Sequence, residues 1–165
     1  MSHTSYSGLR YRRAFGTFVL AYITITIVAA ALSIWLESLM HVPAGSTDPV
    51  HTPSYILAEK FYPLLNLIVW GGFSWVYFRK DDKSSVKRAL ALGTFWLMMA
   101  LPVDYVGFVL IRHPWSLSAH DFYIGQYPWI YLIYITIAIS PLLWTTIHSM
   151  LSDRGQTAAI VKEDR

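Results

Sequence analysis

The sequence predicts an all-α polytopic membrane protein, with four transmembrane helices in an antiparallel bundle and both termini in the cytoplasm. Three observations support this fold class. The 165-residue chain is 55% hydrophobic and only 14% charged, whereas a soluble domain is roughly a quarter charged. Its charged residues separate four long apolar stretches. Its basic residues are concentrated in alternate connections between those stretches, as in multi-pass membrane proteins.

Each apolar stretch is long enough to cross the hydrocarbon core as a helix, which takes roughly 17–25 residues. The first stretch holds no charge, the second lies between Lys60 and Arg79, the third holds only Asp104, and the fourth lies in an uncharged interval. Four such helices would leave a soluble protein almost no polar surface. The predicted spans are about 14–36, 61–78, 89–111 and 129–151.

The first span follows Arg10, Arg12 and Arg13, an arrangement that a secretory signal peptide also shows. Its apolar stretch is longer than the 7–15 residues typical of a signal peptide, so a retained signal-anchor helix is favoured over a cleaved one. The predicted organisation is a cytoplasmic N-terminal tail at 1–13, a transmembrane domain at 14–151 and a cytoplasmic C-terminal tail at 152–165.

The orientation follows from the distribution of lysine and arginine. Eleven of the thirteen lie in the N-terminal tail, the loop at 79–88 and the C-terminal tail, while the other two connections hold only Lys60 and Arg112. The positive-inside rule therefore predicts cytoplasmic termini. We expect a multi-pass protein of the plasma (cytoplasmic) membrane, with the lipid bilayer as partner and possible assembly into a homo-oligomer or a larger membrane complex. The sequence has no dense basic patch with interleaved aromatics, so we expect no nucleic-acid partner.

The two predicted outer loops differ in character. The loop after the first span is rich in proline and small polar residues, which indicates irregular structure, although its last residues can begin the second helix early. In the other loop, Ser118 precedes Asp121 by three residues and resembles a helix-capping pair. We expect a short interfacial helix from about Ala119.

Asp104 is the main functional candidate. It lies about 10 Å below the outer end of the third span, at the usual helical rise. A charge at such a depth costs about 2.5–3.5 kcal/mol and normally faces the bundle or an aqueous cavity. Asp104 shares a helical stripe with Gly93, Ala100 and Gly107, and small residues mark faces where membrane helices approach closely. The neighbouring Pro102 loosens the helix there. We therefore expect the carboxylate to point inward.

The other spans offer polar groups at a comparable depth. On the first span, Ser33 and Glu37 share one face with Thr26 and Ala30 at helical spacing. The predicted ligand- or proton-binding residues of the outward-facing pocket are Ser33, Glu37, Asn66, Asp104 and Tyr134. Such a pocket would bind or transport a small solute or a proton. In the alternative interpretation the protein is a non-catalytic accessory or structural subunit, in which the buried acid only holds helices together.

Metal and enzymatic functions are less well supported. Four histidines on the predicted outer side could assemble a metal site, but no pair has a defined ligand spacing: His41, His51, His113 and His120. The chain has no cysteine, no Walker loop, no dinucleotide fingerprint and no nucleophile elbow. No motif identifies a cofactor, and an enzyme acting on a lipid or quinone is the third interpretation.

Overall fold

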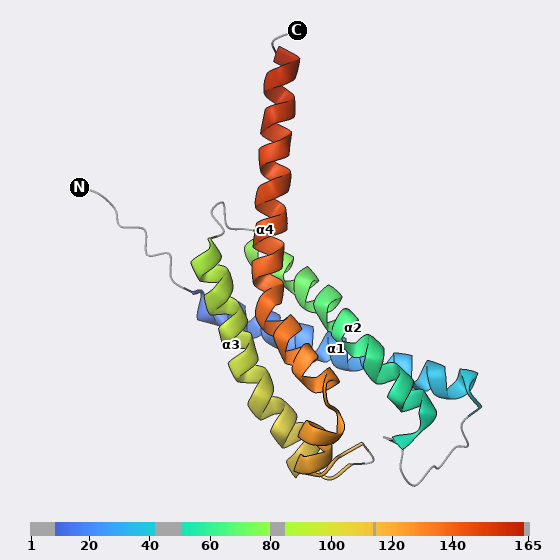
Figure 1. Cartoon of the computed structure of the whole chain (residues 1–165). Coiled ribbons are helices and arrows are strands. Elements are labelled where there is room, and N and C mark those ends of the chain that lie inside the picture. Colours follow the sequence, from blue (N-terminus) through green and yellow to red (C-terminus); the bar gives the residue numbers. More distant parts are fainter. Residues whose placement is uncertain (1–8, 42–50, 80–84, 114, 164–165) are drawn as a thin grey trace.

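The computed structural model describes residues 9–41, 51–79, 85–113 and 115–163, the last of these from 152 onward as backbone only. All regular structure in these ranges is helical (Figure 1). The elements are α1 (Tyr11–Leu39), α2 (Pro53–Phe78), α3 (Val86–Asp104), η2 (Tyr105–Leu110), η3 (Asp121–Gly125) and α4 (Trp129–Glu163). Elements η2 and η3 are short π-helices.

Four helical segments are long and apolar enough to cross a membrane: Tyr11–Leu39, Pro53–Phe78, Val86–Leu110 and Trp129–Leu151. Their outer faces expose large apolar side chains, including Ile27, Ile68, Met98 and Ile135. A soluble protein rarely exposes apolar area on this scale. The chain is therefore an integral, multi-pass membrane protein, as the composition predicts.

Several helix ends lie outside the predicted span ends because polar residues at the boundaries continue or cap the helices, whereas the end of α2 at Phe78 and the start of α4 at Trp129 lie where predicted. Helix α2 begins at Pro53, where the Thr52 hydroxyl accepts a hydrogen bond from the Tyr55 amide at 3.3 Å. Helix α3 begins after Ser85, which caps it in the same way through the Arg88 amide at 3.4 Å. Helix α4 continues to Glu163, well beyond the end of the bundle (Figure 1). The backbone of the predicted C-terminal tail is thus largely helical.

The bundle is held together mainly by three helix pairs, α1 with α2, α2 with α4, and α3 with α4, whereas α1 and α3 contact each other less. Figure 1 shows α1 running obliquely to α3 and α4. Two hydrogen bonds fix the first half of α1: Trp96 donates to the Ala14 carbonyl at 3.0 Å, and Arg13 donates to the Val76 carbonyl at 2.8 Å. Toward its C-terminal end, α1 diverges from α3 (Figure 1).

The small-residue stripe of the third span is only partly an interface. Gly93 packs so closely on α4 that an added Cβ would lie 2.9 Å from the Ala138 carbonyl carbon, and Ala100 is fully buried. The expectation that Gly107 also packs against a helix is wrong, because an added Cβ there meets nothing within 4 Å. The reason is that α3 becomes the wider η2 helix after Asp104, so Gly107 no longer follows the α-helical stripe.

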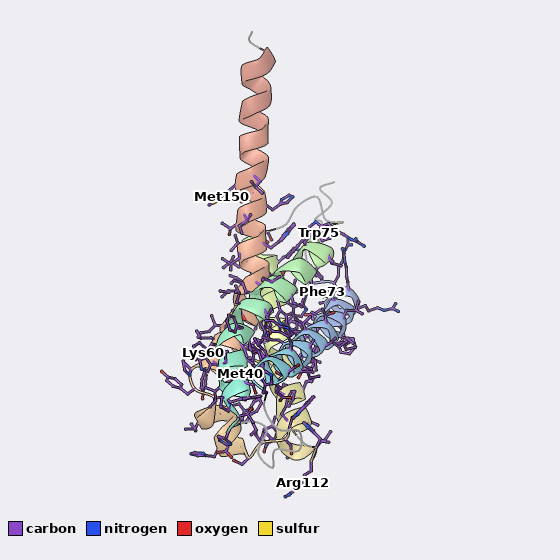
Figure 2. The ribbon with its side chains drawn as sticks, turned by 90° about the vertical axis from the view of Figure 1, so that its right-hand side faces the viewer. Met40, Lys60, Phe73, Trp75, Arg112 and Met150 are labelled. Carbon is purple, nitrogen blue, oxygen red and sulfur yellow. The ribbon has the colours of Figure 1, made fainter. Side chains whose placement is uncertain are left out.

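The predicted capping pair in the loop before α4 is confirmed. The Ser118 hydroxyl donates to the Asp121 carboxylate at 2.7 Å and accepts from the Asp121 amide at 3.1 Å. A helical turn starts at Ala119 and continues into η3. Figure 2 shows Arg112, which precedes this loop, at the opposite end of the bundle from Trp75.

Candidate functional site

A cavity of about 200 Å³ lies where α1 diverges from α3. Every helix of the bundle contributes to its wall, together with η2, η3 and the segment around Trp115 and Leu117. That segment is fixed over the cavity because the Leu117 amide donates to the Phe108 carbonyl at 2.9 Å. Ile34 and Trp115 line the cavity and are also exposed on the protein surface. The cavity is therefore reachable from outside the bundle.

Asp104 is the most deeply buried acid of the cavity wall, with 9% of its surface exposed. It occupies the last turn of α3, immediately before the π-helical η2. The Tyr22 hydroxyl of α1 donates a hydrogen bond to its carboxylate. The buried Tyr134 hydroxyl of α4 also lies close enough to interact with Asp104, although no described atom completes a well-formed hydrogen bond with it. Asp104 is thus surrounded by hydroxyl groups and has no basic side chain as a partner among the described residues.

Hydrogen bonds join α1 to α2 in another part of the cavity wall. Ser33 and Tyr62 share a hydrogen bond of 2.7 Å between their hydroxyl groups. Asn66 donates to the Tyr62 carbonyl at 2.9 Å and accepts from the Trp70 indole at 3.0 Å. The Asn66 amide is therefore held in a fixed orientation by its own helix.

The rim of the cavity holds a second acid and an amide. Glu37, near the end of α1, is half-buried and lines the cavity. Gln126, just after η3, donates to the Tyr55 hydroxyl at 2.7 Å and also bonds to the buried Glu59. This second cluster links the loop before α4 to α2, and Glu59 itself does not line the cavity.

The rest of the cavity wall is aromatic and aliphatic. Seven aromatic residues contribute to it: Tyr22, Tyr55, Tyr62, Trp70, Phe108, Trp115 and Phe122. Isoleucines of α1 and α4 fill the surface between them. No lysine, arginine or histidine lines the cavity among the described residues. The arrangement is an apolar pocket with a few convergent polar groups, which is typical of small-molecule sites.

The structure brings most of the predicted pocket residues together. Ser33, Glu37, Asn66 and Asp104 all line the cavity. Tyr134 lies beside Asp104 but behind the cavity surface, buried with 8% exposure. Tyr134 thus packs near the Asp104 carboxylate and does not form part of the cavity surface.

Three important residues were not predicted from the sequence. Tyr22 lies one turn before Thr26 on the polar face of α1, so extending that face by one turn would have identified it. Trp70 lies one turn after Asn66 and could have been found in the same way. No such signal in the sequence identifies Gln126, because its contact with Tyr55 depends on how the loop before α4 folds over the bundle.

The four candidate histidines do not form a metal site. Among the described residues, no group of three or more histidine, aspartate or glutamate side chains is placed to hold a metal ion. His41, His51 and His120 are exposed, whereas the His113 ring bonds to the Gly107 carbonyl at 2.9 Å. Near His120, hydrogen bonds from Ser118 and from His120 itself lower the pKa of Asp121. These are local loop contacts.

Comparison of the chain with protein-family models, curated proteins and solved structures gave no match. The function is therefore inferred from the cavity and from the residues that line it. The geometry offers a buried carboxylate, fixed polar groups on two helices and an aromatic wall. No described cluster has the arrangement of a metal centre.

Proposed function

We propose that this membrane protein binds a small organic solute in the cavity, with the Asp104 carboxylate as the central polar contact. The observation that supports this best is the position of Asp104 in the wall of a cavity of about 200 Å³ that can be reached from the protein surface. Buried ionisable groups in membrane helices are costly and are functional candidates for that reason.

The surrounding groups favour binding over a purely structural acid. A carboxylate that only joins helices needs hydrogen-bond donors but no open space beside it. Here the cavity extends from Asp104 past the Ser33–Tyr62 pair to Glu37 at the rim. A solute in this space would contact polar groups of α1, α2 and α3 at once.

A second candidate function has its own supporting observation. The Tyr22–Asp104 hydrogen bond joins α1 to α3, a pair of helices that otherwise make little contact. This favours an accessory or structural subunit in which Asp104 holds α1 in place. The two functions differ in one consequence: only the binding function requires the cavity to be occupied by a solute.

The test uses three probes that share a benzyl group and a tetrahedral head: benzyltrimethylammonium, neopentylbenzene and benzylsulfonate. Binding to the purified protein in dodecyl maltoside is measured by isothermal titration, with empty micelles as the blank. Saturable binding of at least one probe is expected. Absence of binding by all three would overturn the proposed function and favour the accessory subunit.

A matched pair of variants locates the binding. Ala30→Trp fills the cavity from α1 and should abolish binding, since Ala30 lines it. Ala91→Trp adds the same side chain at an exposed position of α3 and should leave binding unchanged. Equal binding by both variants would mean that the probe binds elsewhere and would contradict the proposal.

A further inference from the structure

Building on the proposed function, we propose that the solute is an organic cation, a quaternary or protonated amine with an apolar body, whose positive charge lies between the Asp104 carboxylate and the neighbouring aromatic rings. The ammonium group could belong to a free solute or to the headgroup of a lipid. The charge balance, the aromatic wall and the dimensions of the cavity each support this ligand class.

The charge balance of the cavity favours a cation. Two acids, Asp104 and Glu37, contribute to the wall, and no basic side chain does so among the described residues. A buried carboxylate must be neutralised by a proton or by a positive partner. The neighbours of Asp104 are the Tyr22 hydroxyl, which donates a hydrogen bond to it, and the nearby Tyr134 hydroxyl, and neither group brings a charge. A cationic ligand would supply the missing charge, whereas an anion would meet two acids without a counter-ion.

The aromatic wall favours an organic cation in particular. Tyr22 of α1 lines the same cavity as Asp104, as do Tyr62 and Trp70 of α2. Aromatic faces attract cations, and cages of such rings are a common way to bind quaternary ammonium groups. Phe108 and Phe122, whose rings stack with centroids 6.1 Å apart, extend the apolar wall at the loop side. An apolar body next to the charge would pack against these rings.

The composition of the wall argues against an inorganic ion as the ligand. Divalent cations take six or more oxygen ligands in calcium and magnesium sites. The described residues contain no group of three or more potential metal-binding side chains. A cavity of about 200 Å³ also greatly exceeds the space that a bare ion needs, and its wall is mostly carbon. Its size suits a small amine that carries one aromatic or branched apolar group.

The three benzyl probes test the charge of the ligand at constant shape. Benzyltrimethylammonium and neopentylbenzene differ only by the exchange of nitrogen for carbon in the head. The cation is expected to bind at least about tenfold more tightly than the neutral isostere, with the anion weakest, as the coupling of close charge pairs implies. Equal or tighter binding of the neutral or anionic probe would overturn the cation inference and leave the proposed function intact.

Substitution of the acids assigns the charge preference to the cavity. Asp104→Asn should weaken binding of benzyltrimethylammonium by about tenfold or more and change binding of neopentylbenzene by less than about twofold. Asp121→Asn removes an acid outside the cavity and serves as the control. If Asp104→Asn does not fold, Glu37→Gln at the half-buried rim should still reduce the affinity of the cation selectively. Unchanged cation selectivity in the folded acid variants would contradict the inference.

One more binding experiment distinguishes a free solute from a lipid headgroup as the source of the ammonium group. Dihexanoylphosphatidylcholine presents the same trimethylammonium group on a short-chain lipid. Tighter binding of this lipid than of benzyltrimethylammonium would assign the cation to a headgroup, and the reverse order would assign it to a free solute. Either order supports the cationic class. Failure of both ammonium compounds while neopentylbenzene binds would exclude it.

Discussion

At the scale of single residues, Gly93 determines how closely α3 approaches α4. An added Cβ at Gly93 would overlap the carbonyl group of Ala138, which is backbone and cannot turn aside. Gly93→Ala should therefore destabilise the protein by about 1–3 kcal/mol, the usual range for overpacking. In an exposed helix the same change would be stabilising. The measurement is the melting temperature of the purified protein in detergent.

Gly107 provides the control for this substitution. Nothing lies within 4 Å of a Cβ added there, although the residue is on the same helix-forming segment. Gly107→Ala should leave the melting temperature nearly unchanged. A similar decrease in melting temperature for the two variants would show that backbone flexibility, and not contact with α4, explains the requirement for glycine.

Single residues of the candidate site could be predicted to different extents from the sequence. Asp104 stands out because it is the only charge in an apolar span, and Ser33 and Glu37 follow from helical spacing on α1. The contact of Tyr22 with Asp104 depends on how α1 and α3 cross, which spacing along one helix does not specify. The prediction that Gly107 packs against a helix was wrong for a related reason. The π-helical turn after Asp104 changes which side of the helix residue 107 lies on.

At the scale of secondary-structure elements, α1 is attached to α3 by few interactions, and the Tyr22–Asp104 hydrogen bond is one of them. Hydrogen bonds between membrane helices average about 0.6 kcal/mol and reach about 1.7 kcal/mol. A double-mutant cycle with Tyr22→Phe and Asp104→Ala, which removes the acceptor oxygen, should therefore give a coupling of about 1 kcal/mol. The measurement is the free energy of unfolding in mixed detergent micelles.

Thr24 offers a control on the same helix. Its exposed hydroxyl donates to the Leu20 carbonyl at 2.7 Å, a hydrogen bond within α1 itself. Thr24→Val should show no coupling to Asp104→Ala. A coupling of zero for the Tyr22 pair as well would mean that the hydrogen bond does not hold α1 in place and would weaken the accessory-subunit candidate.

The four spanning helices could be predicted because hydrocarbon thickness fixes their minimum length and excludes charge from their centres. Their ends could not be predicted as well. Polar capping residues such as Thr52 and Ser85 extend helices into the aqueous boundary, where hydropathy gives no signal. The change from α3 to η2 beside Pro102 was expected as a loosened helix, but not as a π-helical turn.

At the scale of the whole molecule, the basic residues predict the direction in which the bundle crosses the membrane. Ser46 and Ser84, which lie in the connections after the first and second spans, would be natural labelling positions. Both lie outside the described residues. The prediction of cytoplasmic termini therefore depends on the sequence, where eleven of thirteen basic residues flank one side.

This prediction can be tested with two exposed positions that the structure describes. Ala119 precedes η3 on the predicted outer side, and Ser85 caps α3 on the predicted inner side. The chain has no cysteine, so Ala119→Cys and Ser85→Cys each create a single labelling site. In intact cells a membrane-impermeant maleimide should label position 119 and not position 85, and both positions should react after the cells are opened. Labelling of position 85 alone would invert the topology, and the cavity rim at Glu37 would then face the cytoplasm.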